Sequence, residues 1–285
     1  MKKTILLALV LACTAAPAAA GKGHLLIVGG GEKPLEELHE FVTLCHGKPI
    51  LIITSASGDP VEAGTDMVQQ FTQAGAKDVA WRHIDGVAIA DSDSMVANIN
   101  RAGGIFFTGG DQDRLMQRVG GSRSEKALHV LYREKGAIIG GTSAGAAVMS
   151  RVMITGNELI NKDSSNIFIT IQTGNVETKT GFGFMDQVII DQHFAARKRH
   201  NRLICVVLEH PTLPGIGIDE DTAILVYPDN TFRVYGEGTV IVYDARQAAA
   251  IRHNEKGVLA ARNIKMDLLV AGDRYTLEQK GSSTK

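Results

Sequence analysis

A serine bracketed by glycines lies at position 143, within residues 140–146. The apolar residues 137–139 before it indicate a short buried strand, and residues 147–149 after it indicate the start of a helix. In the pattern Gly-x-Ser-x-Gly, the glycines let the backbone make the cramped strand-to-helix turn that lifts a serine hydroxyl above the strand end. The N–H groups that follow such a turn face the negative oxygen that develops when an acyl group is attacked. The segment therefore predicts a nucleophilic serine, and the alternative is an ordinary turn rich in small residues.

His193 is the best candidate among nine histidines for the base that such a serine needs. A serine hydroxyl is a weak nucleophile until a neighbouring base accepts its proton. His193 directly follows the apolar residues 188–190, so we expect it at a strand end, whereas several other histidines fall within predicted helices. No histidine pair has the H-E-x-x-H spacing of a zinc site and the cysteines are not clustered, so neither a metal nor another cofactor is expected.

Strands that alternate with helices must position these two side chains. Predicted strand runs alternate with segments of helical periodicity, and the runs comprise residues 24–28, 49–54, 79–84, 104–108 and 137–139. Because these runs are apolar on both faces, they predict a largely parallel sheet covered by helices on both sides. Ligands bind such sheets at the carboxyl ends of the strands, where three polar loops are expected to meet: residues 55–59, residues 109–113 and the Ser143 segment.

Three glycines follow the first of these strands, at positions 29–31. A dinucleotide-binding G-x-G-x-x-G motif counted from Gly29 would need a glycine at position 34, where Pro34 stands. A tight turn is therefore the better explanation of these glycines.

The pattern changes after the serine segment. Residues 222–227 and 231–235 are short β-type runs joined by Pro-Asp-Asn, and residues 240–243 form another, so antiparallel ribbons are expected. Residues 197–210 have the pattern of a basic amphipathic helix. Because neither a linker nor an internal repeat separates the two parts, residues 21–285 are expected to form one α/β domain with a β-rich C-terminal portion.

Composition bounds the class of protein. The 285 residues are 44% apolar and 21% charged, which is typical of a globular chain able to bury a large core. With 5% aromatic residues and a formal net charge of −1, the chain has neither the stacking residues nor the basic excess of a nucleic-acid-binding protein. Cys45 and Cys205 both have apolar neighbours, which favours buried thiols while leaving a bridge between them open.

Residues 1–20 have the pattern of a secretory signal peptide. Lys2 and Lys3 precede an apolar run at residues 5–12, and three alanines at 18–20 offer a cleavage site. Export, either to a periplasm or to the medium, is therefore expected. A less favoured alternative is a lipoprotein attached through Cys13. No later apolar run approaches the ~18 residues of a transmembrane helix.

Four segments in order along the chain resemble the cyanophycinase family, which belongs to the serine peptidases together with the aspartyl dipeptidases. The segments are residues 107–112, residues 141–149, residues 191–194 with two arginines that follow, and residues 215–223, and the resemblance extends from about residue 24 to residue 245. The resemblance implies a fold related to class I glutamine amidotransferases and a triad of serine, histidine and an acid. It also implies hydrolysis of cyanophycin, a poly-aspartate that carries arginine on its side chains, to β-aspartyl-arginine dipeptides by way of an acyl-enzyme. A homodimer is expected on the same grounds.

The motifs of that family assign roles to individual residues. Ser143 corresponds to the nucleophile and His193 to the general base. The acid is expected at Glu158, because residues 155–158 resemble a segment that carries the acid in the related dipeptidases, and Glu220 is the second candidate.

The same resemblance predicts the side chains that line the substrate site, namely Gln112, Asp191, Gln192, Arg197 and Arg202, with Glu220 as a further acidic candidate. Arginines suit the carboxylates of such a polymer through paired hydrogen bonds, and a carboxylate such as Asp191 suits its guanidinium groups. The oxyanion donors are expected to be backbone N–H groups of Gly110, Asp111 and Ala144.

Three other functions remain alternatives to this hypothesis. An exopeptidase acting on short α-aspartyl peptides would use the same serine chemistry. A secreted binding protein could keep the fold and groove without catalysis, although Ser143, His193 and an available acid argue against it. An amidotransferase would need a cysteine where Ser143 stands.

Overall fold

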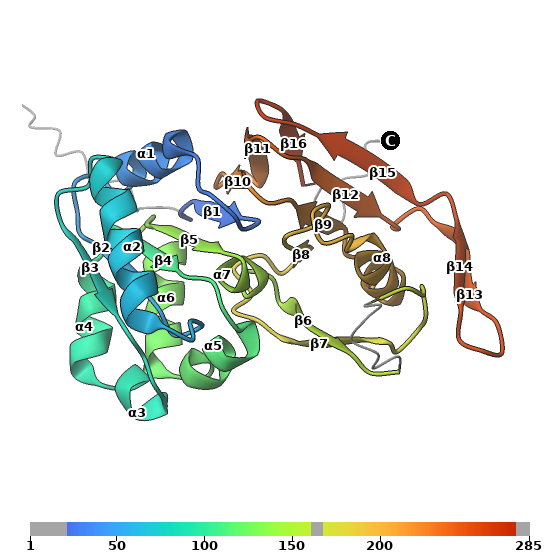
Figure 1. Ribbon diagram of the computed structural model, residues 1–285, viewed down its shortest axis with the longest axis horizontal. Coiled ribbons are helices and arrows are strands. Elements are labelled where there is room, and N and C mark those ends of the chain that lie inside the picture. Colours follow the sequence, from blue (N-terminus) through green and yellow to red (C-terminus); the bar gives the residue numbers. More distant parts are fainter. Residues whose placement is uncertain (1–21, 161–167, 278–285) are drawn as a thin grey trace, which may run out of the picture.

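A computed structural model describes residues 22–160 and 168–277. The expected signal peptide at residues 1–20, including Cys13, lies outside the described residues. The central element is an eight-stranded sheet with the strand order β16-β11-β10-β1-β5-β4-β2-β3 (Figure 1). Its parallel part consists of β1 (Leu25–Val28), β2 (Ile50–Ile53), β3 (Val79–Arg82), β4 (Gly104–Phe107) and β5 (Ile138–Thr142).

Helices cover both faces of this sheet, because its inner strands are apolar on both sides. On one face, α1 (Leu35–Leu44) and α2 (Pro60–Gln73) pack against Leu26 and Phe106. The other face, which includes Leu25 and Phe107, is covered by α4 (Asp93–Arg101), α5 (Gln112–Val119) and α6 (Arg123–Arg133). A short helix α3 (Val87–Ala90), which the sequence did not indicate, precedes α4.

The C-terminal portion extends the sheet and builds a second one. The expected ribbon consists of β10 (Thr222–Val226), which pairs antiparallel with β1, and β11 (Thr231–Gly236), which β16 (Arg274–Thr276) follows. The second sheet has the order β15-β12-β9-β8 and comprises β8 (Ile189–Asp191), β9 (Gly215–Ile218), β12 (Val240–Asp244) and β15 (Lys265–Leu269).

Helix α8 (His200–Glu209) packs on the second sheet through Leu203, Val207 and Tyr243. The helix begins three residues later than the basic pattern predicts, because Lys198 has a φ of 53° and residues 195–199 form turns instead. Two further ribbons complete the fold: β6 (Val152–Glu158) with β7 (Val176–Thr180), and β13 (Ala249–His253) with β14 (Leu259–Arg262).

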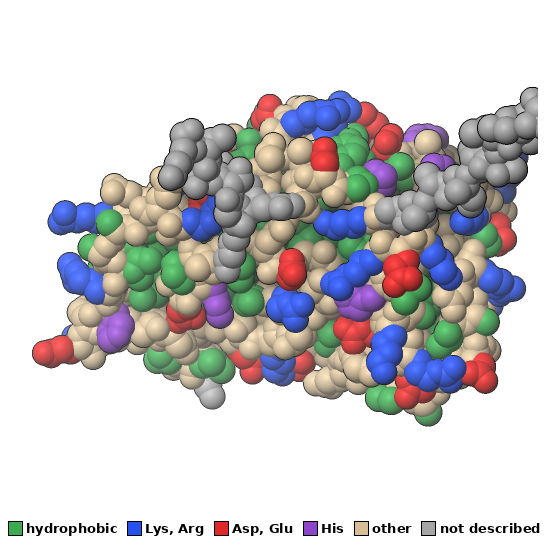
Figure 2. Space-filling view, turned by 180° about the vertical axis from the view of Figure 1, so that it is seen from behind, with side chains coloured by type: hydrophobic (Ala, Val, Ile, Leu, Met, Phe, Trp, Pro, Cys, Tyr) green, Lys and Arg blue, Asp and Glu red, His purple; other side chains and the backbone are tan. Residues whose placement is uncertain are grey.

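Cys45 and Cys205 are buried and free, as their apolar neighbours indicate. Within residues 22–160 and 168–277, no helix combines the length and apolarity needed to cross a bilayer. Basic and acidic side chains are interspersed over the described part of the face in Figure 2.

Candidate active site

Ser143 occupies the sharp turn between β5 and the short helix α7 (Ala144–Ala147). Its φ and ψ are 54° and −111°, a strained conformation for a residue with a side chain. A Cβ on Gly145 would overlap the Phe107 carbonyl oxygen, and one on Gly141 would overlap the Gly145 carbonyl. The two glycines therefore let the turn pack tightly against β4, which is the geometry of a nucleophile elbow.

His193 joins Ser143 to an acidic side chain. Its Nε2 lies 2.8 Å from the Ser143 Oγ, and its Nδ1 lies 2.5 Å from the Glu220 Oε1. A carboxylate only accepts hydrogen bonds, so Nδ1 carries the ring proton and Nε2 is left to accept the Ser143 hydroxyl. The arrangement is that of a serine, histidine and acid triad.

The glycines after β1 make room for this imidazole. The His193 N–H donates to the Gly29 carbonyl at 2.8 Å, and a Cβ on Gly30 would overlap the ring. The glycine-rich turn is thus a tight turn, as expected, but its close approach to the histidine is visible only in three dimensions.

Glu158, the preferred acid from sequence, is not in contact with the histidine. It lies in β6 opposite Val176 of β7, and its Oε1 accepts a hydrogen bond from the Asn175 Nδ2 at 2.7 Å. The β6 strand therefore holds the carboxylate within the β6–β7 ribbon. Glu220, the second candidate, takes the position beside His193 because the β9–β10 turn that carries it returns to the site.

The pKa shifts at the triad fit a neutral base next to an ionised acid. Partial burial lowers the pKa of His193 below 6.5, and the hydrogen bond to Glu220 opposes this shift. That hydrogen bond lowers the pKa of Glu220, assisted by the nearby Arg197, whose Nε lies 3.5 Å from the Glu220 Oε1. At neutral pH the imidazole is consequently available to accept a proton.

Two of the three expected oxyanion donors are free in the described part of the chain. The Gly110 and Ala144 N–H groups donate to no acceptor there, and a Cβ on Gly109 would lie 3.4 Å from the Ser143 Cβ, so this turn flanks the serine. The Asp111 N–H instead donates to the Ala56 carbonyl at 2.9 Å. The expectation that Asp111 contributes an oxyanion donor is therefore not supported.

Asp191 and Arg202 form a buried ion pair. Their side chains are 1% and 2% exposed, and the Arg202 Nε donates to the Asp191 Oδ2 at 2.8 Å while Nη2 donates to Oδ1. A charge removed from water needs a partner, and here each of these groups has the other. This ion pair corrects the expectation that the Asp191 and Arg202 side chains bind charged groups of the substrate, because their charged atoms already bind one another.

The two glutamines are likewise engaged with the protein. The Gln112 Nε2 donates to the Ile154 and Thr155 carbonyls at 2.9 and 2.6 Å, which ties the start of α5 to β6. The Gln192 Oε1 accepts from the Arg199 Nη1 at 2.9 Å. Of the expected substrate-binding side chains, Arg197 is the one whose charge is most accessible, with 54% of its side chain exposed.

The sequence profile of Peptidase family S51 matches residues 24–234. The chain belongs to this family. It is accordingly a serine-type peptidase, as the resemblance implied.

Curated relatives of this S51 peptidase match most of its length. A protein named cyanophycinase from Thermosynechococcus vestitus is 33% identical over 267 residues, covering 90% of this chain and 80% of that protein. Another so named, from Geminocystis herdmanii, is 32% identical over 262 residues, covering 89% of this chain and 93% of that protein.

A solved structure shares the fold of this S51 chain. The crystal structure of a peptidase from an acI-B1 Actinobacterium aligns with a TM-score of 0.66 at 21% identity, covering 91% of this chain and 98% of that one. The expected class I glutamine amidotransferase-like fold, with its largely parallel and helix-covered sheet, is thereby confirmed.

Sequence reasoning missed Arg199. Its Nη1 donates to both the carbonyl and the side-chain oxygen of Gln192, the residue next to the histidine, and burial lowers its pKa to about 10. Its place between Arg197 and Arg202 in one basic segment was a signal that could have drawn attention to it. Within the described ranges, no group of three or more His, Cys, Asp and Glu side chains could hold a metal ion.

Proposed function

We propose that this S51 peptidase hydrolyses cyanophycin to β-aspartyl-arginine dipeptides, with Ser143 as nucleophile, His193 as base and Glu220 as acid. The observation that carries the catalytic part is the chain of contacts from the Ser143 Oγ through His193 to Glu220, at 2.8 and 2.5 Å. The substrate is supported by the curated relatives, which bear the name cyanophycinase.

The reaction would proceed through an acyl-enzyme. The Ser143 Oγ attacks the scissile carbonyl carbon while the His193 Nε2 takes its proton, and the Gly110 and Ala144 N–H groups bind the resulting oxyanion. The imidazolium then gives the proton to the leaving amine as the C–N bond breaks. Water then attacks the acyl-enzyme while its proton passes to the His193 Nε2. That proton returns to the Ser143 Oγ as the acyl C–O bond breaks, which releases the acid product and the free serine. Glu220 keeps the imidazole in the reactive tautomer and stabilises its charged form.

Substrate recognition would rely on exposed charge at the site. Cyanophycin presents carboxylates and guanidinium groups at every repeat, and an arginine such as Arg197 can hold a carboxylate through paired hydrogen bonds. Arg197 is suited to this because it is half-exposed and lies beside the acid of the triad.

The test is incubation of the purified chain lacking residues 1–20 with insoluble cyanophycin granules, followed by mass analysis of the soluble products. Release of β-aspartyl-arginine is expected. The matched control is Ser143→Ala, which removes only the hydroxyl and should lower the rate by about 10⁶-fold. Near-normal turnover by the alanine variant would exclude the serine mechanism, and hydrolysis of α-aspartyl-arginine in preference to the polymer would favour an exopeptidase.

We further propose that the enzyme is exported and works as a homodimer. Export is supported by the charged, apolar and small-residue regions within residues 1–20. Fractionation of a bacterial host expressing the full chain tests it, since activity confined to the cytoplasm would contradict export. Light scattering coupled to gel filtration tests the dimer, which a monomeric mass would exclude.

A further inference from the structure

A second hydrogen-bonded cluster lies next to the triad, between α5 and the loop after β2. Two arginines of α5 hold consecutive carbonyls of that loop: the Arg118 Nη1 donates to the Ser55 oxygen at 3.0 Å and the Arg114 Nη1 to the Ala56 oxygen at 3.3 Å. Neither arginine contacts Ser143, His193 or Glu220 in these bonds. The cluster therefore needs an explanation other than direct contact with the reacting groups.

The loop that these arginines hold is in direct backbone contact with the oxyanion turn. The Ala56 oxygen also accepts the Asp111 N–H at 2.9 Å. A Cβ on Gly110, whose φ is 133°, would overlap the same oxygen, so the turn packs directly on Ala56. Because Gly110 supplies one of the proposed oxyanion donors, displacement of the Ala56 carbonyl would displace that donor.

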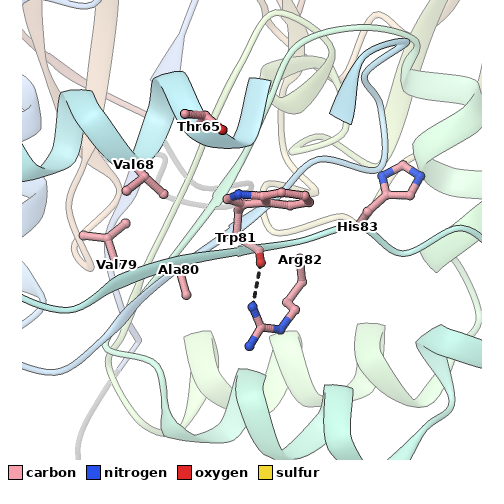
Figure 3. Close-up of a pocket in the computed structure, with 7 residues that line it drawn as sticks. All are labelled: Thr65, Val68, Val79, Ala80, Trp81, Arg82 and His83. Carbon is pink, nitrogen blue, oxygen red and sulfur yellow. Dashed lines mark hydrogen bonds between the residues drawn. The ribbon is translucent and has the colours of Figure 1, made fainter. Parts of the chain in front are cut away.

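Arg118 is itself fixed by groups that follow β3. Its Nη2 lies 3.0 Å from the Asp85 Oδ1, and its Nη1 lies 3.3 Å from the His83 Nε2. The other ring nitrogen of His83 lies 3.2 Å from the Oγ1 of the buried Thr54. Figure 3 shows His83 just beyond β3, on the same side of the strand as Trp81. With 23% of its side chain exposed, Arg118 is thus held at both ends of its guanidinium.

We propose that Arg118, together with Arg114, is a positioning residue for the oxyanion turn. The two guanidinium groups hold the Ser55 and Ala56 carbonyls, and the Ala56 carbonyl holds the turn at which the Gly110 N–H meets the tetrahedral oxygen. An oxyanion donor acts only when it lies about 2.7–3.1 Å from that oxygen. A small displacement of the donor therefore reduces the stabilisation of the transition state more than it reduces substrate binding. The proposal rests on the proposed serine mechanism but not on the identity of the substrate.

The test compares Arg118→Met with wild-type enzyme in steady-state kinetics and in the rate of inactivation by a fluorophosphonate, whose phosphoryl oxygen occupies the oxyanion site. We expect kcat and the inactivation rate to fall together by about 10- to 100-fold, while KM changes by less than about 2-fold. This decrease is smaller than the one expected when an oxyanion donor is removed completely. Arg118→Lys, which retains one charged donor, should recover part of both rates. Arg114→Met should likewise lower kcat and leave KM nearly unchanged.

The matched control is Arg123→Met. Arg123 also donates from its Nη1 to a loop carbonyl, that of Asp91 at 2.8 Å, but on α6 and outside the cluster. Its kcat and inactivation rate should equal those of wild type. Thermal unfolding of all variants identifies any loss of fold, and if Arg118→Met melts early then Arg118→Lys and Arg114→Met carry the comparison.

Two results would overturn the proposal: a kcat and inactivation rate for Arg118→Met equal to those of Arg123→Met, or a raised KM with unchanged kcat. Inactivation by the phosphonate requires no cyanophycin. If the enzyme proves inactive on that polymer, slower inactivation of Arg118→Met still supports the positioning role, and equal rates still refute it.

Discussion

At the scale of single residues, the hydrogen bond between His193 and Glu220 is the reason for proposing Glu220 as the triad acid. Glu220→Gln replaces an acceptor by a group that can also donate, so the imidazole loses the partner that keeps its proton on Nδ1. We expect kcat to fall by about 10³- to 10⁴-fold. The comparison is Glu158→Gln, which alters the bond to Asn175 and should change kcat by only a few-fold. Equal losses in the two variants would remove Glu220 from the triad.

The lowered pKa of His193 predicts the acid limit of activity. A protonated imidazole cannot accept the Ser143 proton, so kcat/KM should fall as the pH drops through the pKa of the free enzyme's histidine, at a midpoint below 6.5. Burial is the main cause of the lowering, and the positive charge of Arg197 contributes to it.

Arg197→Met should therefore move this midpoint to higher pH, whatever it does to KM. The measurement is a pH profile of kcat/KM for both enzymes over about pH 4 to 9, a range that spans the ordinary histidine pKa. A midpoint that stays in place, or moves to lower pH, would show that Arg197 does not act on the imidazole.

At the scale of elements, the buried Glu37 of helix α1 should make the free energy of unfolding depend on pH. Its side chain is 1% exposed, both carboxylate oxygens lack a hydrogen-bond partner among the described residues, and burial raises its pKa to about 8. The folded chain therefore holds a proton that the unfolded chain releases above about pH 4.5. The free energy of unfolding should decrease as the pH rises from about 4.5 to about 8, by at most ~5 kcal/mol.

Glu37→Gln keeps the shape of the side chain but cannot ionise. Urea unfolding at several pH values should show that this variant loses most of that pH dependence and exceeds wild type in stability above pH 8. Identical pH dependence in the two proteins would contradict the assignment to Glu37.

The buried Gln112 side chain should contribute more to the attachment of the β6–β7 ribbon to α5 than the exposed ion pair between Lys179 and Asp113 does. Gln112→Leu leaves the Ile154 and Thr155 carbonyls without their donor and should cost about 1–3 kcal/mol of unfolding free energy. Lys179→Met removes the bond to Asp113 at 2.7 Å, but both partners are partly exposed, so the cost should be smaller than that of Gln112→Leu. Urea denaturation of both variants measures the ranking, and the reverse order would contradict it.

At the scale of the whole molecule, the proposed substrate predicts selectivity for a branched and charged polymer. A site that places the exposed Arg197 beside the triad gains from a chain with a carboxylate at every repeat, whereas most positions of an ordinary protein offer none. Cyanophycin should dissolve under conditions in which casein remains intact. Parallel assays with both polymers and with α-aspartyl-arginine measure this preference, and faster cleavage of casein would indicate a general protease.

The fold was predictable to the extent that burial leaves a local pattern. Strands β1, β2, β4 and β5 are apolar on both faces because helices cover both sides, and this can be read from the sequence at each strand separately. The edge strand β3 is only partly buried and ends at the exposed Arg82. The β10–β11 ribbon was predictable from its turn residues. The ribbons β6–β7 and β13–β14 were not, because they are partly exposed and lack the regular alternation of a half-buried strand.

For the site, the sequence by itself singled out Ser143 and His193, which the structure places in contact, since a strand end followed by a glycine-flanked serine or by a polar segment is a local signal. The tertiary structure decided which groups they meet. Glu220 rather than Glu158 lies beside His193, Asp191 and Arg202 neutralise each other, and the Asp111 N–H is taken by Ala56. The physical reason is that a residue's type and neighbours report its burial and its place in an element, whereas its hydrogen-bond partner depends on strand order and on which turns return to the same sheet edge. These are set by contacts between segments far apart in the chain.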